Sequence, residues 1–173
     1  MLRIFYPKLY ISSVLEIDQV FLRQKGIKGI LFDLDNTIVC REDSRCSPEV
    51  EECLAGLRRH GFKIAILSNN SARRVGAFAR HLGIPSVHRA VKPWKRPFIQ
   101  AVKMLGTTPH ETAIIGDQIF TDILGGNMAG LYTILVTPLQ GKEFLGTRLF
   151  SRPLEKIILA RLNKKKDINA DIF

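Results

Sequence analysis

Short apolar runs alternate with amphipathic segments along most of this 173-residue chain, and this alternation most constrains its fold. The apolar runs predict five strands, at 28–33, 62–68, 86–90, 112–116 and 131–136. Residues with helical spacing lie between them, which predicts helices near 47–60, 71–82, 94–105 and 119–129. A strand–helix–strand order of this kind predicts an α/β fold of three layers, in which helices cover both faces of an open, mainly parallel sheet.

We expect a single domain over 1–173, because no linker, repeat or low-complexity stretch divides the chain. Within it we expect an amino-terminal extension and helix at 1–26 and a basic amphipathic segment at 142–166. The composition, 46% hydrophobic and 24% charged, excludes a disordered chain. No apolar run is long enough to cross a bilayer and the first residues do not resemble a secretory signal, so we expect a cytoplasmic protein with three reduced cysteines.

The charge is unusual in both size and placement. The formal net charge is +10, and no acidic residue occurs between Cys53 and His110, where eleven basic residues lie. A solvated face without a partner usually mixes both signs, so this bias favours an anionic partner. Nucleic acid, anionic lipid and phosphorylated small molecules all fit that description. Helices that merely carry basic outer faces would give the same pattern.

Polar residues follow four of the five predicted strands. In strand order they are Asp33, Asp35 and Thr37; then Ser68 and Asn69; then Lys92; then Asp117 and Asp122. Ligands of open parallel sheets bind beyond the carboxyl ends of the strands, so we expect these side chains to meet at one edge. The sequence therefore predicts a site made of carboxylates, a hydroxyl and a lysine.

This set of side chains suits phosphoryl chemistry. Crowded carboxylates repel one another unless a cation lies among them, and a few hard oxygen ligands with room for water suit Mg²⁺. A lysine and a hydroxyl beside such an ion would bind the oxygens of a phosphoryl group. A carboxylate in line with the phosphorus could attack it and form an aspartyl-phosphate.

The same residues resemble the haloacid dehalogenase (HAD) superfamily of phosphatases. Four motifs match in order: Asp-x-Asp-x-Thr at 33–37, a strand ending in Ser68, a lysine at Lys92, and Gly-Asp at 116–117 with Asp122 five residues beyond the aspartate. The resemblance implies a Rossmann-like fold and Mg²⁺-dependent hydrolysis of phosphate monoesters. An aspartate at the second position of the first motif is typical of the phosphatases of this superfamily, and the dehalogenases lack it.

The resemblance also implies roles for the first motif. Asp33 would be the nucleophile and a Mg²⁺ ligand. Asp35 would bind Mg²⁺ through its backbone carbonyl, protonate the leaving alcohol and then activate water. Thr37 would support the loop that carries both aspartates, next to the substrate.

The other motifs receive roles in the same way. Ser68 would donate a hydrogen bond to the phosphoryl group, and Asn69 beside it is a further candidate for substrate binding. Lys92 would neutralise charge on the phosphoryl group and on Asp33. Asp117 would be a metal ligand, and Asp122 a second ligand or a partner just outside the ligand shell.

Two assignments have alternatives. Lys95 could replace Lys92 as the lysine of the third motif, although Lys92 lies closer to the strand end. Asn36, Asn69, Asn70 and Asn127 could line the site, but asparagine in turns often serves the backbone instead.

The spacing of the motifs bears on the substrate. Only thirty residues separate Thr37 from Ser68 and twenty-three separate Ser68 from Lys92, so the inserted cap domain of many HAD enzymes does not fit. Further residues resemble the YqeG-type, subclass IIIA branch, which is related to mitochondrial phosphatidylglycerophosphate phosphatase: 5–13, 68–70, 116–122 and 125–127.

An anionic lipid phosphate at the inner membrane face is therefore one expected substrate. The segment 142–166 agrees, because apolar and basic residues alternate there at helical spacing, as in helices that lie on anionic bilayers. Such a helix could equally pack its apolar face on the sheet. The alternatives are a phosphatase acting on nucleotides, nucleic-acid ends, phosphoproteins or small metabolites, and a basic RNA- or ribosome-binding module with a vestigial site. The sequence does not specify an oligomeric state.

Overall fold

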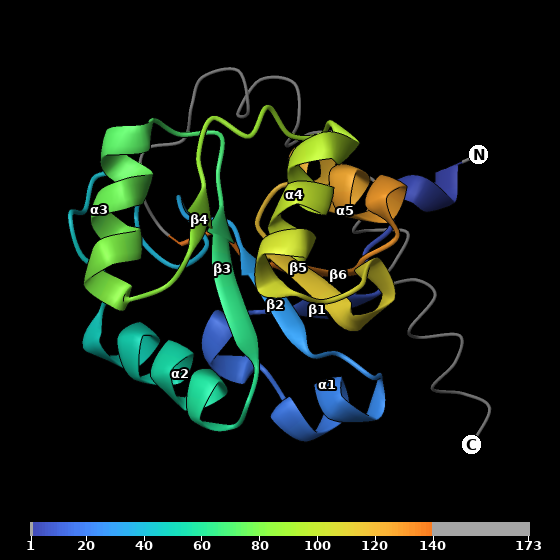
Figure 1. The fold of residues 1–173 in the computed structure, drawn as a ribbon, viewed down its shortest axis with the longest axis horizontal. Helices are drawn as coiled ribbons and strands as arrows, with labels where there is room; N and C mark the ends of the chain where they lie inside the picture. The colour runs from blue at the N-terminus through green and yellow to red at the C-terminus, as the bar shows by residue number, and fades with distance from the viewer. Residues whose placement is uncertain (1, 140–173) are drawn as a thin grey trace. The chain divides into compact units, whose positions relative to one another are not determined.

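Six parallel strands form one sheet in the computed structural model, which describes residues 2–139 (Figure 1). Their order across the sheet is β1-β6-β5-β2-β3-β4. The strands are β1 (Leu9–Ile11), β2 (Gly29–Phe32), β3 (Lys63–Leu67), β4 (Ser86–Val87), β5 (Thr112–Gly116) and β6 (Tyr132–Val136). The α/β class and the parallel sheet predicted from the sequence are thus confirmed.

Helices cover both faces of this sheet. They are α1 (Gln19–Gln24), α2 (Pro48–Arg59), α3 (Ala72–Leu82), α4 (Lys95–Leu105) and α5 (Leu124–Ala129). The apolar sides of α1, α2 and α3 join one buried cluster and those of α4 and α5 join another. In Figure 1 α2 and α3 accordingly lie to the left of β3, and α4 and α5 to its right.

Alternate residues of the central strand explain the two layers. Ile30 and Phe32 of β2 belong to the first cluster, whereas Leu31 between them belongs to the second. Side chains of a strand point to opposite faces in turn, so a continuous apolar run is what a strand buried on both sides requires. All four residues of β2 are buried, and β2 lies between β5 and β3. The loop that follows β2 therefore emerges at the middle of the sheet.

Helix boundaries follow from capping residues. The side chains of Ser47 and Ser71 accept hydrogen bonds from backbone amides in the first turns of α2 and α3. Gly83 and Gly106 end α3 and α4 in the left-handed conformation, which glycine adopts without strain. These helices agree with the predicted ranges to within a residue or two. The predicted helix 119–129 differs, because its first turn, Ile119–Ile123, is a π-helix that leads into α5.

Two strand predictions need correction. The sheet has six strands and not five, because Leu9–Ile11, in the segment predicted as an extension and helix, pairs in parallel with β6. This strand is three residues long and only partly buried, so it carries no clear alternation. The strand predicted at 86–90 ends at Val87, because Arg89 has a positive φ of 47°, which breaks the extended backbone.

Two further expectations concern the periphery of the fold. Between Thr37 and Ser68 the described chain is occupied by α2 and β3, and no cap domain occurs there, as predicted. The predicted amphipathic segment 142–166 lies outside the described residues. Among the helices of residues 2–139, none combines the length and the apolarity that a bilayer crossing needs.

Candidate active site

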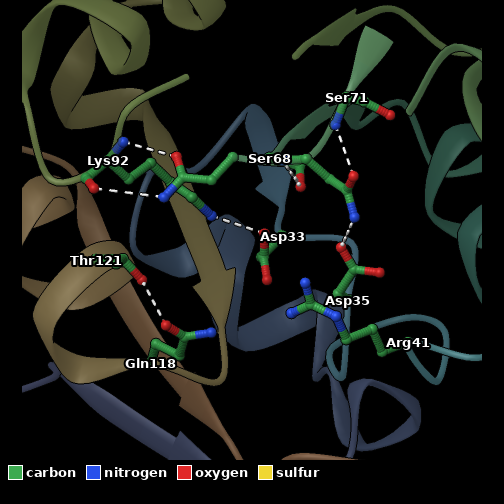
Figure 2. A pocket seen from close by; sticks show the side chains of 10 residues that line it. Asp33, Asp35, Arg41, Ser68, Ser71, Lys92, Gln118 and Thr121 are labelled. Atoms are coloured by element: carbon green, nitrogen blue, oxygen red, sulfur yellow. Dashed lines mark hydrogen bonds and ion pairs between the residues drawn. The ribbon is translucent and has the colours of Figure 1, made fainter. Parts of the chain in front are cut away.

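A cavity of about 240 Å³ opens at the carboxyl ends of β2 and β3 (Figure 2). Ten residues line it: Asp33, Asp35, Arg41, Ser68, Asn69, Asn70, Ser71, Lys92, Gln118 and Thr121. Five of the residues predicted from the sequence are therefore brought together here, from segments that are far apart in the chain. The predicted metal ligands Asp117 and Asp122 lie next to this cavity, buried around Asp33.

The end of β2 fixes the position of Asp33. Its backbone amide donates to the carbonyl of Ile115 at 2.9 Å, so Asp33 continues the pairing of β2 with β5 by one residue. The chain then turns around the carbonyl of Leu34, which accepts from three successive amides, those of Thr37, Ile38 and Val39. The turn thereby places Asp33 and Asp35 at the same edge of the sheet.

Lys92 lies between two carboxylates in the least exposed part of the site. Its Nζ is 2.7 Å from Oδ1 of Asp33 and 2.5 Å from Oδ1 of Asp122. Its side chain is only 2% exposed, so this charge is paired almost entirely within the protein. Burial opposes the charge on Lys92, but the carboxylates of Asp122 and Asp33 outweigh that effect and raise its pKa. Lys92 is therefore a fixed positive charge beside Asp33.

The carboxyl group of Asp33 is affected by burial in the opposite direction. Burial raises its pKa to about 7; the ammonium group of Lys92 lowers it, and the carboxylate of Asp122 adds to the rise. A further positive charge near Asp33 would favour the ionised form that nucleophilic attack requires.

Asn69 holds the backbone of Lys92. Its Oδ1 accepts from the amide of Lys92 at 2.7 Å, and its Nδ2 donates to the carbonyl of Lys92 at 3.4 Å. In this way the residue after Ser68 at the end of β3 fixes the loop that follows β4. Lys95 is exposed at the first turn of α4, so the geometry favours Lys92 over Lys95 as the lysine of the site.

Three carboxylates form a candidate metal centre. One oxygen each from Asp33, Asp117 and Asp122 lies within 4.8 Å of the others, and all three residues are buried. Gly116 makes this approach possible, because a Cβ at that position would lie 2.3 Å from Cγ of Asp122. Hard carboxylate oxygens clustered at the end of a cavity match the ligand preference of Mg²⁺. The donor set therefore fits the expected ion, and the side chain of Asp35 lies outside it.

Asp35 is held on the opposite side of the cavity. Its Oδ2 accepts from Nδ2 of Asn70 at 2.8 Å, and its Oδ1 accepts from Nε of Arg74 at 2.8 Å (Figure 2 shows the first contact). The guanidinium of Arg74 also donates to the carbonyls of Asp43 and Cys40. Arg74 thus ties the first turn of α3 to the loop after β2 and orients Asp35. Sequence reasoning missed Arg74, whereas Asn70 was among the asparagines that could line the site, and it does line the cavity.

Thr37 does not line the cavity, although we expected it next to the substrate. It is 1% exposed and lies outside the residues that line the cavity, so its place in the structure is the turn itself. Two of the asparagines also serve the backbone: Asn36 adopts a positive φ of 62°, and Nδ2 of Asn127 donates to the carbonyls of Ile4 and Tyr6.

Solved structures share this fold. The cobalt-bound deoxy-D-mannose-octulosonate 8-phosphate phosphatase (YrbI) of Haemophilus influenzae aligns with a TM-score of 0.53 at 18% identity, over 65% of this chain and 69% of that one. An uncharacterized protein of Listeria monocytogenes aligns with a TM-score of 0.54 at 20% identity, over 81% of this chain and 99% of that one. At these identities the likeness concerns the fold.

Sequence relatives show more. Residues 40–130 match the haloacid dehalogenase-like hydrolase family. The chain is 37% identical to the Bacillus subtilis protein "Probable phosphatase YqeG", covering 96% of each chain. It is 30% identical to "Phosphatidylglycerophosphate phosphatase 1, chloroplastic/mitochondrial" of Arabidopsis thaliana, over 92% of this chain but only 48% of the plant protein. With the cavity and its carboxylates in place, this chain belongs to the haloacid dehalogenase-like hydrolases and is a phosphatase of the YqeG type.

Proposed function

We propose that this phosphatase hydrolyses phosphate monoesters in a Mg²⁺-dependent reaction through an aspartyl-phosphate on Asp33. The observation that carries the proposal is the position of Asp33, which lines the cavity while Lys92 and the other two carboxylates surround it. A carboxylate needs such a setting to attack a phosphoryl group, because both reactants are negatively charged. Asp33, Asp117 and Asp122 would hold Mg²⁺, which when bound supplies positive charge for the phosphoryl oxygens.

The first step transfers the phosphoryl group to the protein. An oxygen of Asp33 forms a bond to phosphorus, the bond from phosphorus to the ester oxygen breaks, and Asp35 gives a proton to the departing alkoxide. Lys92 and Ser68 bind the phosphoryl oxygens during the transfer. Asn70 and Arg74 hold Asp35 at the edge of the cavity, which is the position that a proton donor to the leaving group needs.

The second step regenerates Asp33. Asp35, now ionised, takes a proton from a water molecule as the water oxygen bonds to phosphorus. The bond between phosphorus and the Asp33 oxygen breaks, which restores the Asp33 carboxylate and releases inorganic phosphate. Asp35 thus returns to its protonated form and the cycle closes.

We further propose that the physiological ester is a lipid phosphate of the phosphatidylglycerophosphate type. Three features support this substrate: the relative in Arabidopsis, the cavity left open where a cap would lie, and the cationic excess between Cys53 and His110. An open site can reach a phosphate that projects from a surface, whereas a capped site encloses a small metabolite.

The test is Mg²⁺-dependent release of inorganic phosphate from phosphatidylglycerophosphate in mixed micelles and from a soluble aryl phosphate. Wild type and Asp33→Asn are compared, with circular dichroism to show that both fold. We expect wild type to turn over both esters and to prefer the lipid, and Asp33→Asn to release neither. Equal efficiency on the two esters would remove the lipid proposal but keep the mechanism. Undiminished turnover by Asp33→Asn would remove the mechanism.

A further inference from the structure

The loop that carries Lys92 presents unusual side chains to solvent. The loop 88–94 connects β4 to α4 (the yellow-green segment between these labels in Figure 1), and it is called the lysine loop below together with the first two residues of α4, Lys95 and Arg96. Trp94 is 67% exposed and Val91 is 61% exposed, and both are among the most exposed large apolar residues in the described part of the chain. Between them Lys92 is 7% exposed, with its ammonium group at Asp33. The loop therefore joins an apolar surface directly to the reaction centre.

Backbone contacts hold the lysine loop in this arrangement. The amide of Arg89 donates to the carbonyl of Asn70 at 2.9 Å, and the amide of Ala90 donates to the carbonyl of Ser68 at 3.1 Å. The amide of Trp94 closes a turn onto the carbonyl of Val91 at 3.2 Å. The outward position of the two apolar residues is thus built into a well-bonded loop.

Both the backbone conformation and the exposure of Val91 are unfavourable for a valine. Its φ is +53°, in the left-handed region that β-branched residues rarely adopt, and its side chain remains in water. A polar residue such as asparagine would fit both the backbone and the solvent better. Residues in such strained backbone conformations cluster at functional sites.

Positive charge surrounds these apolar residues. Arg89, Lys95 and Arg96 of the same loop are exposed, and no acidic residue occurs from Cys53 to His110 to compensate them. Arg89, Val91, Trp94 and Arg96 also line a hollow of about 460 Å³. A tryptophan and an aliphatic side chain beside exposed arginine and lysine match the chemistry of an anionic bilayer surface, which is apolar below its charged headgroups.

We propose that the lysine loop docks on anionic lipid bilayers, with Val91 and Trp94 below the headgroups and Arg89, Lys95 and Arg96 at the lipid phosphates. The docking rests on the proposed function in one respect: the lipid substrate would come from the same bilayer surface. Lys92, which contacts Asp33, would then lie in the same loop as the two side chains inserted into the bilayer. Docking itself requires no catalysis.

The test uses the only tryptophan of the chain, Trp94, as a reporter of its own burial. Tryptophan emission of the full-length protein is recorded with vesicles of phosphatidylglycerol and with vesicles of phosphatidylcholine. We expect a blue shift and protection from acrylamide quenching with the anionic vesicles only, which high salt reverses by screening. The same shift is expected in Asp33→Asn, so docking and catalysis are read separately.

Two variants and their matched controls localise the contact by vesicle co-sedimentation. Val91→Asn should lower partitioning on anionic vesicles by about tenfold and Arg96→Ser by about fivefold. The controls Met104→Ser and Lys103→Ser change an exposed apolar and an exposed basic residue at the other end of α4. They should leave the partitioning on anionic vesicles unchanged. Val91→Asn should also unfold at the same or a higher temperature than wild type, because it relieves the backbone.

Several results would overturn the docking. Co-sedimentation without any change in Trp94 emission would place the contact on another segment of the chain. Equal partitioning of Val91→Asn and Met104→Ser would show that the lysine loop takes no part. A shift of Trp94 emission with single-stranded RNA but not with anionic vesicles would replace the bilayer by a nucleic acid.

Discussion

The two sides of the cavity hold their aspartates in different ways. On the nucleophile side, Asp33 and Asp122 share the ammonium group of Lys92, and the three side chains are at most 7% exposed. On the other side, Asp35 is bound by Asn70 and Arg74, and its side chain is 13% exposed while that of Arg74 is 21% exposed. The side chains on the nucleophile side are almost fully buried, whereas those on the other side are partly exposed to water.

The difference matches the two tasks that the proposed reaction sets. A group that forms a covalent bond must keep its position, and burial against the strand ends fixes Asp33 and Lys92 through the sheet. A group that gives and takes protons must be reached by leaving alcohol and water alike, so Asp35 needs orientation and access together. Predictions on the buried side should therefore have larger effects than those on the accessible side.

The largest effect is expected from Lys92→Met. This change removes the shared cation from Asp33 and Asp122 and leaves buried carboxylates facing each other, which should lower stability by about 3–5 kcal/mol. Turnover should fall by about 100- to 1,000-fold. Thermal unfolding with and without Mg²⁺ checks the cause, because Mg²⁺ should stabilise Lys92→Met more than wild type. Lys95→Met is the control; a comparable loss of turnover there would argue that Lys95 is the essential lysine.

A smaller effect is expected from Gly116→Ala. The new methyl group would lie 2.3 Å from Cγ of Asp122, so that carboxylate must move away from Asp33 and Asp117. The Mg²⁺ concentration for half-maximal activity should rise about 10- to 100-fold. Gly56→Ala in α2, where the nearest heavy atom is 3.7 Å from the new methyl, should instead stabilise the fold by about 1 kcal/mol. An unchanged Mg²⁺ requirement in Gly116→Ala would remove Asp122 from the metal centre.

The smallest effect is expected from Arg74→Gln on the accessible side. Loss of the guanidinium frees Oδ1 of Asp35, so proton transfer to the leaving group should suffer while attack by Asp33 does not. Turnover of an alkyl phosphate should fall about tenfold, and that of p-nitrophenyl phosphate should fall less, because its leaving group hardly needs a proton. Arg73→Gln, at the exposed neighbour on α3, is the control. Equal losses on both esters would assign Arg74 a purely structural role.

The fold could be predicted where burial leaves a clear pattern. The strands β2, β3, β5 and β6 are apolar runs buried on both faces, and α2, α3 and α4 carry capping residues at their ends. The edge strands were harder to predict because they are two and three residues long and partly exposed. The π-helical turn before α5 was missed, because the sequence pattern of a single wide turn does not differ from that of an α-helix.

The site residues could likewise be predicted only where the sequence carries a clear pattern. Residues directly after strands, such as Asp33, Ser68 and Lys92, could be placed because strand ends meet at one edge. Arg74 could not, because it lies in a helix and reaches Asp35 through a long side chain whose direction the sequence does not specify. A usable signal existed nonetheless: Arg74 lies in the first turn of α3, six residues after Ser68, within the stretch that has no acidic residue to pair with it.

The pairing of β1 with β6 has a consequence for synthesis in the cell. Lys8 bonds to Thr133, 125 residues later, so the amino-terminal strand is translated long before its partner exists. At about 5–20 residues per second, it waits on the order of ten seconds beside a growing ribosome-bound chain. During this interval β1 is open to pairing with other nascent chains, and afterwards it covers the edge of β6. Deleting residues 9–11 would therefore expose that edge permanently and should appear as aggregation during expression.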